Sequence, residues 1–262
     1  MDAYTDFASV YDLFMDNVPY DEWGERVISL MEKYDIKEVP EGDEALMQEA
    51  GLVVDLGCGT GTLTKILADK GIDTIGVDMS FEMLEVARNK CEFCEKTPMF
   101  LCQDMRELEL FCTVGAVISM CDCINYLLTT DDLLTTFKLV NNYLYPRGLF
   151  IFDFNTVYKY RDVIGDTTIA ENRIDGSFIW ENFYYEEEQI NEYDLTIYKK
   201  DDEDKYIRFE ETHIQRGYEP ETIIELVKNA GMEVVIAFDA QTEGDINEET
   251  QRVCIVAREI IK

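Results

Sequence analysis

DLGCGTG, at residues 55–61, lies between an apolar run at 52–56 and an amphipathic stretch that begins at residue 63. Its closely spaced glycines let the backbone approach a ligand, and the helix that follows offers free amide groups beside them. The pattern D-x-G-x-G-x-G fits at every fixed position. A dinucleotide fingerprint that started at Gly57 needs a small residue at position 62, where threonine stands. The stretch therefore predicts a ligand-binding turn between a strand and a helix.

Short apolar strands alternate with amphipathic helices on the carboxyl side of this turn. Predicted strands cover residues 52–56, 74–77, 99–102, 116–120 and 149–154, and predicted helices cover residues 63–70, 81–89 and 131–144. Two last strands, 233–238 and 252–257, have no long helix between them and must pair antiparallel. We therefore expect an α/β fold with a doubly wound, mostly parallel, seven-stranded Rossmann-like sheet and an antiparallel last strand.

Two segments lie outside this alternation. Residues 1–35 predict an N-terminal helical cap that breaks at Pro19, and residues 36–50 predict an acidic linker. Between about 156 and 218, apolar and polar residues alternate with a period of two, which predicts an inserted antiparallel β-sheet. The expected domains are residues 1–155 together with 219–262, and the inserted subdomain 156–218.

The net charge of the chain limits the kinds of molecule that it is expected to bind. The 262 residues contain 23 Lys and Arg against 55 Asp and Glu, a formal net charge of −32, without a run of basic residues. Nucleic acid and anionic membrane surfaces are therefore poor candidate partners, and a small molecule or a protein is favoured. The sequence start has no secretory pattern, and no apolar run approaches the length of a membrane span. We expect a cytoplasmic protein whose eight cysteines are reduced.

Several motifs together resemble the class I S-adenosylmethionine-dependent methyltransferases, over about residues 50–155 and 219–260. The matching pieces are DLGCGTG (55–61), GVDMS (76–80), Gln103-Asp104-Met105, CDCINYL (121–127) and the final antiparallel strand. Residues 11–12 and 19–23 look like the leading helices of small bacterial methyltransferases that are related in architecture to glycine N-methyltransferase. The resemblance implies S-adenosylmethionine as the cofactor.

The resemblance also implies a role for each matching residue. Asp55 would hold the methionyl ammonium, directly or through water, and Asp78 would accept from both ribose hydroxyls. The other implied cofactor contacts are Gly57 and Gly59 under the methionine and ribose, Met79, Asp104 and Met105 at the adenine, Tyr11 and Trp23 closing from the helical cap, and Cys121 after strand four. Tyr11 and Trp23 also fit core aromatics on apolar helix faces, and Asp104 also fits a solvated strand end.

Candidate catalytic residues follow strand four and lie in the insertion. A sulfonium leaving group needs mainly a nucleophile held in line, with a base where that nucleophile carries a proton. Asp122, Asn125 and Tyr126 occupy the place from which a nucleophile can be oriented, although Asn125 equally fits a turn cap. His213, the only histidine, falls on the inward face of a strand two residues after Glu211. It is either a base or a structural histidine.

The predicted function is therefore methyl transfer to a small molecule, with protein side chains as an alternative acceptor. The segment after strand four lacks the Asn/Asp-Pro-Pro-Tyr/Phe pattern of nucleobase methylation. A non-catalytic S-adenosylmethionine-binding or regulatory protein is one rival, and a nicotinamide-dependent oxidoreductase, disfavoured by Thr62, is another. No metal is expected, because the pair at Cys91 and Cys94 has no second pair to complete a site. The inserted sheet is expected to wall the acceptor pocket or, alternatively, to form a homodimer.

Overall fold

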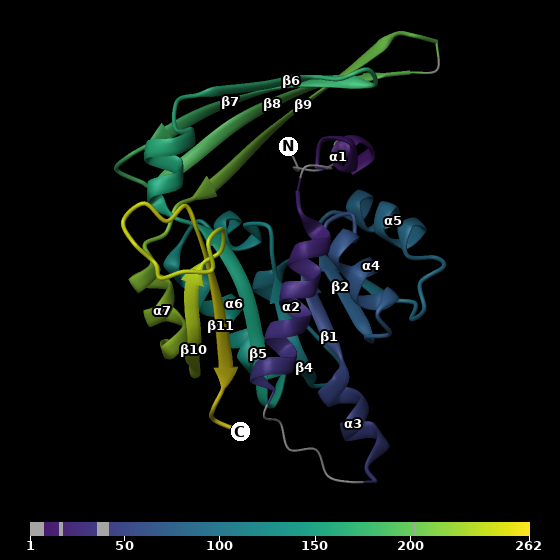
Figure 1. Cartoon of the computed structure of the whole chain (residues 1–262), viewed down its shortest axis with the longest axis vertical. Helices are drawn as coiled ribbons and strands as arrows, with labels where there is room; N and C mark the ends of the chain where they lie inside the picture. The colour runs from purple at the N-terminus through teal and green to yellow at the C-terminus, as the bar shows by residue number, and fades with distance from the viewer. Residues whose placement is uncertain (1–7, 16–17, 36–41, 202) are drawn as a thin grey trace.

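A mixed seven-stranded sheet forms the body of the protein (Figure 1). The computed structural model describes residues 8–15, 18–35, 42–201 and 203–262. In the order β10-β11-β5-β4-β1-β2-β3, the strands are Met232–Asp239, Arg252–Glu259, Leu144–Asn155, Val114–Ser119, Val53–Leu56, Thr74–Asp78 and Met99–Cys102. Strands β1 to β5 are parallel, and β11 pairs antiparallel with both β5 and β10. The predicted sheet is confirmed, including its antiparallel last strand.

Helices cover both faces of this sheet. They are α1 (Ala8–Phe14), α2 (Tyr20–Tyr34), α3 (Glu44–Gly51), α4 (Thr62–Asp69), α5 (Phe81–Lys90), α6 (Thr130–Tyr143) and α7 (Pro220–Asn229). Phe150 and Phe152 of β5 pack with α6 and α7 on one face. Leu149 and Ile151, which alternate with them, pack with α2 and α4 on the other face. The continuous apolar run of β5 is thus buried on both sides, because successive strand side chains point in opposite directions.

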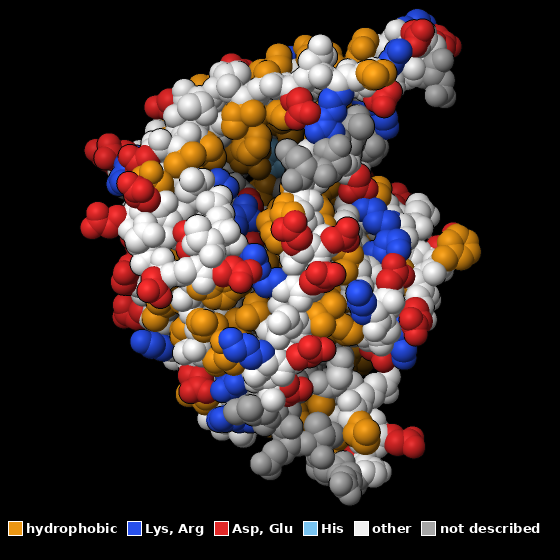
Figure 2. Space-filling view, in the orientation of Figure 1, with side chains coloured by type: hydrophobic (Ala, Val, Ile, Leu, Met, Phe, Trp, Pro, Cys, Tyr) orange, Lys and Arg blue, Asp and Glu red, His pale blue; other side chains and the backbone are white. Residues whose placement is uncertain are grey.

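A second, antiparallel sheet is inserted between β5 and α7. Its strands are β6 (Thr168–Asn172), β7 (Gly176–Tyr185), β8 (Ile190–Lys200) and β9 (Tyr206–Arg216), in that order. Figure 1 shows it arching over the carboxyl edge of the main sheet, with α1 beneath it. The rings of Phe14 in α1 and Phe178 in β7 meet edge to face, 5.1 Å between centroids. The space between the two sheets is a hollow in which apolar side chains are visible (Figure 2).

The predicted helical cap consists of α1 and α2, and α2 begins directly after Pro19. The parts of this prediction at residues 1–7 and 16–17 lie outside the described residues. Within the described ranges, no helix combines the length and the apolar character that a membrane span needs.

The predicted acidic linker is wrong at residues 44–50. Residues 44–50 belong to helix α3, whose first turn is capped by the Asp43 carboxylate, an acceptor for the Leu46 amide at 3.1 Å. The high acidic content of this segment led to the linker prediction, although the segment forms a short amphipathic helix in which Ala50 is buried. Residues 36–41, the remainder of the predicted linker, are outside the described part of the chain.

Candidate active site at the carboxyl edge of the sheet

The glycine loop after β1 is packed on one side and open on another. Gly57 and Gly59 have φ angles of +81° and +53°, which favour glycine. A Cβ on Gly57 would lie 2.7 Å from the Cys123 sulfur, whereas no described atom lies within 4 Å of a Cβ built on Gly59. The Cys123 thiol also donates to the Gly57 carbonyl at 3.2 Å. The loop is therefore braced at Gly57 and accessible to a ligand at Gly59.

Asp78, at the end of β2, holds this loop in place. Its two carboxylate oxygens accept the amides of Gly59 at 2.8 Å and Ser80 at 2.9 Å. Burial raises the pKa of Asp78, and backbone hydrogen bonds from Ser80, Gly59 and Met79 oppose that shift. A carboxylate has about four acceptor positions. Acceptor capacity therefore remains for a hydroxyl group of a ligand beside the loop.

Asp55 lies in β1 beneath the loop and is 2% exposed. The Thr64 hydroxyl donates to its carboxylate at 2.6 Å. Burial raises the pKa of Asp55 from 3.8 to about 6. A ligand ammonium beside this carboxylate would favour its ionised form, so the residue suits a cationic amine.

The ends of β2 and β3 carry the residues expected at the adenine. Met79 is 68% exposed, unusual for methionine, and is free to pack on a flat apolar ligand. Asp104 is engaged by the Arg106 guanidinium, whose Nε lies 3.0 Å from Oδ1, and this contact lowers the pKa of Asp104. Met105 reaches under the glycine loop, 3.7 Å from a Cβ built on Gly57. The strand-end pattern did not predict Arg106.

The helical cap brings its two predicted aromatics to different surroundings. The Tyr11 hydroxyl lies 3.4 Å from that of Tyr20, and Tyr11 also packs against the small apolar cluster beneath the inserted sheet. Trp23 meets Tyr20 edge to face at 5.7 Å, and the Arg252 guanidinium lies 5.4 Å from its ring centroid. Trp23 thus lies beside the strand ends rather than in the apolar clusters of the sheet.

A polar cluster ties helix α1 to the glycine loop. The Lys90 ammonium lies 2.8 Å from the Asp12 carboxylate, 3.0 Å from the Thr60 hydroxyl and 2.7 Å from the Thr62 hydroxyl. Thr60 in turn donates to Asp12 at 2.7 Å. One ammonium group therefore joins α1, α5 and the loop.

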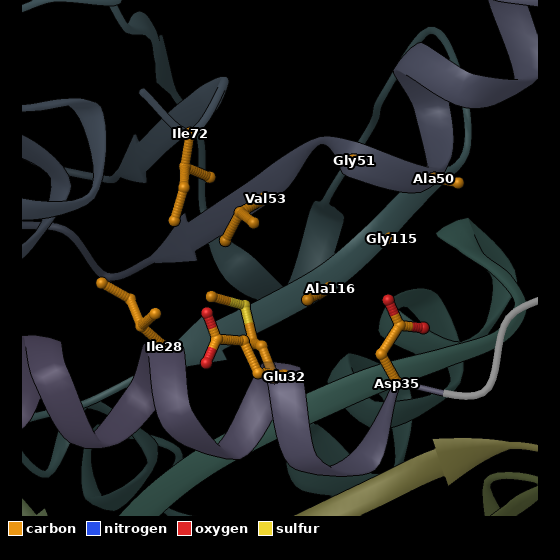
Figure 3. Close-up of a pocket in the computed structure, with 10 residues that line it drawn as sticks. Ile28, Glu32, Asp35, Ala50, Gly51, Val53, Ile72, Gly115 and Ala116 are labelled. Atoms are coloured by element: carbon orange, nitrogen blue, oxygen red, sulfur yellow. The ribbon is translucent and has the colours of Figure 1, made fainter. Parts of the chain in front are cut away.

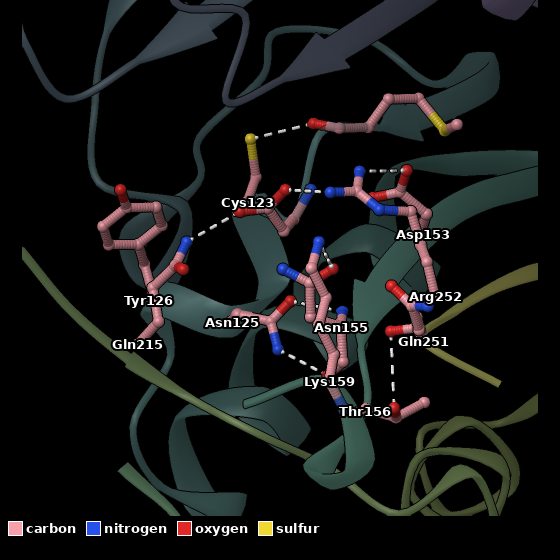
Figure 4. A network of polar contacts seen from close by, with 12 residues as sticks. Cys123, Asn125, Tyr126, Asp153, Asn155, Thr156, Lys159, Gln215, Gln251 and Arg252 are labelled. Atoms are coloured by element: carbon pink, nitrogen blue, oxygen red, sulfur yellow. Dashed lines mark hydrogen bonds and ion pairs between the residues drawn. The ribbon is translucent and has the colours of Figure 1, made fainter. Parts of the chain in front are cut away.

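The chain after β4 is held in a strained turn by charge. Cys121 and Asp122 both have left-handed φ angles, +66° and +54°. The Asp122 carboxylate pairs with Arg252 and accepts from Gln215 at 2.8 Å. Arg252 also pairs with Asp153 at 3.0 Å, and Asp153 accepts the Asp122 amide at 2.8 Å (Figure 4). No local sequence pattern predicted Arg252 or Asp153 as site residues.

Asn125 is structural. It is fully buried, and its amide group donates to the carbonyls of Asn155 at 2.9 Å and Arg216 at 2.7 Å. Its oxygen accepts the Asn155 amide at 2.8 Å. Both side-chain donors are occupied, so Asn125 ties the turn after β4 to the ends of β5 and β9.

Tyr126 joins the main sheet to the inserted sheet. Its hydroxyl lies 3.1 Å from His213 Nδ1 and 3.0 Å from the Tyr193 hydroxyl. The Glu211 carboxylate lies 3.2 Å from His213 Nε2, which confirms the predicted neighbouring carboxylate. His213 is 2% exposed and stacks on Tyr193 at 4.8 Å between ring centroids. Tyr193, directly opposite His213 in the strand register, was not predicted as a site residue.

Another pocket lies at the opposite, amino edge of the main sheet (Figure 3). Its lining comes from α2, the end of α3 and the starts of β1 and β4, including Ile28, Met31, Val53 and Ala116. Ligands of open α/β sheets bind at the carboxyl ends of the strands. The residues described above, and not this pocket, therefore form the candidate active site.

Comparisons with known proteins agree with this geometry. Residues 53–148 match the family model described as a methyltransferase domain. The chain is 35% identical to the Bacillus subtilis (strain 168) protein named "Putative methyltransferase YqeM", covering 97% of this chain and 96% of that protein. A Streptomyces venezuelae protein, dTDP-3-amino-3,4,6-trideoxy-alpha-D-glucopyranose N,N-dimethyltransferase, is 30% identical over 56% of each chain.

A solved structure extends the likeness to nearly the whole fold. The crystal structure of an S-adenosylmethionine-dependent methyltransferase from Clostridium acetobutylicum ATCC 824 superposes with a TM-score of 0.84 and 28% identity. It covers 98% of this chain and 99% of that one, inserted sheet included. The cofactor predicted from DLGCGTG and its neighbours is thereby confirmed. The chain belongs to the class I S-adenosylmethionine-dependent methyltransferases.

Proposed function

We propose that this methyltransferase methylates a small molecule held between the inserted sheet and the carboxyl edge of the main sheet, with Tyr126 and His213 accepting a proton. The observation that carries the proposal is the hydrogen-bonded group of Tyr126, His213 and Tyr193, which spans the two sheets. S-adenosylmethionine supplies an activated methyl group on a good leaving group. The protein therefore has to bind, orient and deprotonate the acceptor.

The proposed cofactor site lies along the ends of β1 to β4. Its residues are Tyr11, Trp23, Asp55, Gly57, Gly59, Asp78, Met79, Asp104, Met105 and Cys121. The buried carboxylate of Asp55 and the open face of Gly59 support the placement of the methionyl group. The amide-anchored Asp78 and the exposed Met79 support the placement of ribose and adenine.

The proposed proton acceptor is a relay rather than one side chain. Tyr126 would take the acceptor's proton as its own hydroxyl proton moves to His213 Nδ1, 3.1 Å away. The resulting imidazolium would be stabilised by the Glu211 carboxylate, 3.2 Å from the other ring nitrogen. A buried, orientated relay of this kind is most useful for a hydroxyl or a protonated amine.

A small-molecule acceptor is supported by charge and by kinship. A net charge of −32 opposes the binding of nucleic acid. The Streptomyces venezuelae relative is named for the dimethylation of an amino sugar nucleotide, which is a small molecule. We propose a cytoplasmic location as well, supported by eight free cysteines.

Residues 156–218 are proposed to be the acceptor subdomain of a domain formed by 1–155 and 219–262. A homodimer through the outer face of the inserted sheet is a second part of the proposal, supported by exposed apolar side chains there, at Ile179 and Phe183. Sedimentation velocity tests it: Phe183→Glu should convert a dimer to a monomer. A monomeric wild-type protein would contradict it.

The function is tested by measuring S-adenosylhomocysteine formation with a panel of small amines, alcohols and carboxylic acids. We expect turnover with at least one class, and loss of cofactor binding in Asp78→Asn. Turnover with proteins alone would contradict the small-molecule acceptor. If the protein binds the cofactor but shows no turnover with any panel compound or any lysate fraction, the proposal that it is a catalyst would be contradicted.

A further inference from the structure

Lys159 is a lysine beside the candidate active site that forms no ion pair with a described residue. It lies just beyond the end of β5, at the start of the short helix Lys159–Ile164. Its ammonium donates to Asn155 Oδ1 at 3.0 Å. Among the described residues, no carboxylate forms an ion pair with it. An ammonium has three donors, so two of them have no described partner.

The neighbouring cation, Arg252, does form ion pairs. Arg252 is paired with two carboxylates, those of Asp122 and Asp153. The charges of these two carboxylates also act on Lys159, but both carboxylates are paired with Arg252. Burial, followed by the charge of Arg252, lowers the pKa of Lys159. The charges of Asp122 and Asp153 oppose this shift, but neither carboxylate forms an ion pair with Lys159 itself.

Lys159 lies in the polar network at the carboxyl ends of β4 and β5. Figure 4 shows Lys159 beside Asn155, in the same network as Asp153 and Arg252. This network holds the strained turn at Cys121, which is in the proposed cofactor site. Lys159 is therefore a cation in the network that borders the proposed cofactor site.

We propose that Lys159 binds an anionic group of a small molecule in this site, through carboxylate or phosphate oxygens. The inference rests on the proposed location of the active site. Two sources share this chemistry: the methionyl carboxylate of the cofactor, and an acidic group on the acceptor. Charged hydrogen bonds of this kind change affinity by roughly 10- to 100-fold.

The first arm of the test compares two nucleosides by calorimetry. S-adenosylhomocysteine carries the amino-acid carboxylate, and 5′-methylthioadenosine lacks it. If the cofactor is the source, Lys159→Met and Lys159→Gln should bind S-adenosylhomocysteine about 10- to 100-fold more weakly and 5′-methylthioadenosine unchanged. Lys159→Arg should retain most affinity, and Lys138→Met, which removes an exposed lysine on α6, should match wild type.

The second arm titrates protein saturated with S-adenosylhomocysteine with acetate or inorganic phosphate at constant ionic strength. If the acceptor is the source, these anions should raise the melting temperature of wild type and not of Lys159→Met. Without ligand, both neutral variants should melt at or above the wild-type temperature, because an unpaired charge is removed.

Wild-type behaviour of the neutral variants in both arms would overturn the proposal, and it is the result expected if Lys159 were a general base. A lower melting temperature with unchanged binding would assign Lys159 a structural role and overturn it as well. Asp78→Asn distinguishes these outcomes from a wrong location of the proposed cofactor site. If that location is right, this variant should bind both S-adenosylhomocysteine and 5′-methylthioadenosine more weakly.

Discussion

The imidazole Nδ1 of His213 lies 3.1 Å from the phenol oxygen of Tyr126, although 87 positions separate them in the chain. Tyr126 follows the carboxyl end of β4, and His213 lies in β9 of the inserted sheet. The contact therefore attaches the inserted sheet at the point where the main sheet presents its ligand-binding edge. It also gives the buried imidazole of His213 a hydrogen-bonded path to that edge.

Removing either member of this contact should affect chemistry more than cofactor binding. Tyr126→Phe and His213→Asn should lower kcat by about 10²- to 10⁴-fold, the usual contribution of general base catalysis. Affinity for S-adenosylhomocysteine should stay within about twofold, because the proposed relay would contact the acceptor and not the cofactor. Tyr206→Phe, which changes a 54% exposed tyrosine, is the matched control. Equal losses of affinity and stability in the two relay variants would indicate a purely structural role.

Most of the fold was predictable because its strands are locally encoded. A strand such as β4 is buried at all six residues, so it reads as a continuous apolar run with little ambiguity. Helix α3 was not predictable in the same way. Its eight residues include the buried Ala50 but only a short apolar pattern, and acidic neighbours dominate the surrounding composition.

Residues of the candidate site were predictable where they belong to a short sequence motif at the end of a strand. Asp55 and Asp78 belong to short motifs next to the strands that position them. The pairs of Arg252 with Asp153 and Asp122 span 99 and 130 residues and leave no local pattern. Tyr193 was missed for the same reason, because it becomes a neighbour of His213 through strand register alone.

The two glycines of the loop should lose stability to different extents when each is replaced by alanine. At Gly57 a Cβ would contact the Cys123 sulfur at 2.7 Å in addition to the strain of a positive φ. Gly57→Ala should therefore lower the free energy of unfolding by about 2–4 kcal/mol. Gly59→Ala has open space and should cost about 1–2 kcal/mol, while weakening S-adenosylhomocysteine more strongly than its stability loss explains. Denaturant midpoints and calorimetry separate the two; equal stability losses would contradict the packing difference.

Asp55 should make stability depend on pH without ligand. Its pKa rises from 3.8 in the unfolded chain to about 6 in the fold, so the protonated carboxyl stabilises the fold below about pH 4. That contribution, about 3 kcal/mol, should be lost as the pH rises through 6. Denaturation between pH 4 and 7 measures it, as the difference between wild type and Asp55→Asn. Parallel curves for the two proteins would show that Asp55 does not titrate in this range.

The same carboxylate should make cofactor affinity change with pH in the other direction. A bound ammonium needs the ionised form of Asp55, so S-adenosylhomocysteine should bind more weakly as the pH falls below about 6, by up to tenfold per pH unit. Binding should also release a proton. Calorimetry in two buffers of different ionisation enthalpy detects that release, which Asp55→Asn should abolish.

Lys90 should slow the departure of the cofactor rather than stabilise the fold. Its ammonium joins Asp12 of α1 to Thr60 of the glycine loop, and α1 carries Tyr11, which is proposed to close over the cofactor. An ion pair that is 21% and 45% exposed adds only about 0–1 kcal/mol to stability, so the melting temperature should hardly change. Opening α1 breaks every contact of this ammonium to Asp12, however. Lys90→Met and Asp12→Asn should therefore each raise the dissociation rate of S-adenosylhomocysteine by about 3- to 10-fold, and the double variant should add little.

Stopped-flow displacement measures this dissociation rate. The matched control is Lys96→Met, which breaks the exposed pair with Asp73. Unchanged rates in both variants would mean that α1 opens independently of the loop or does not cover the cofactor.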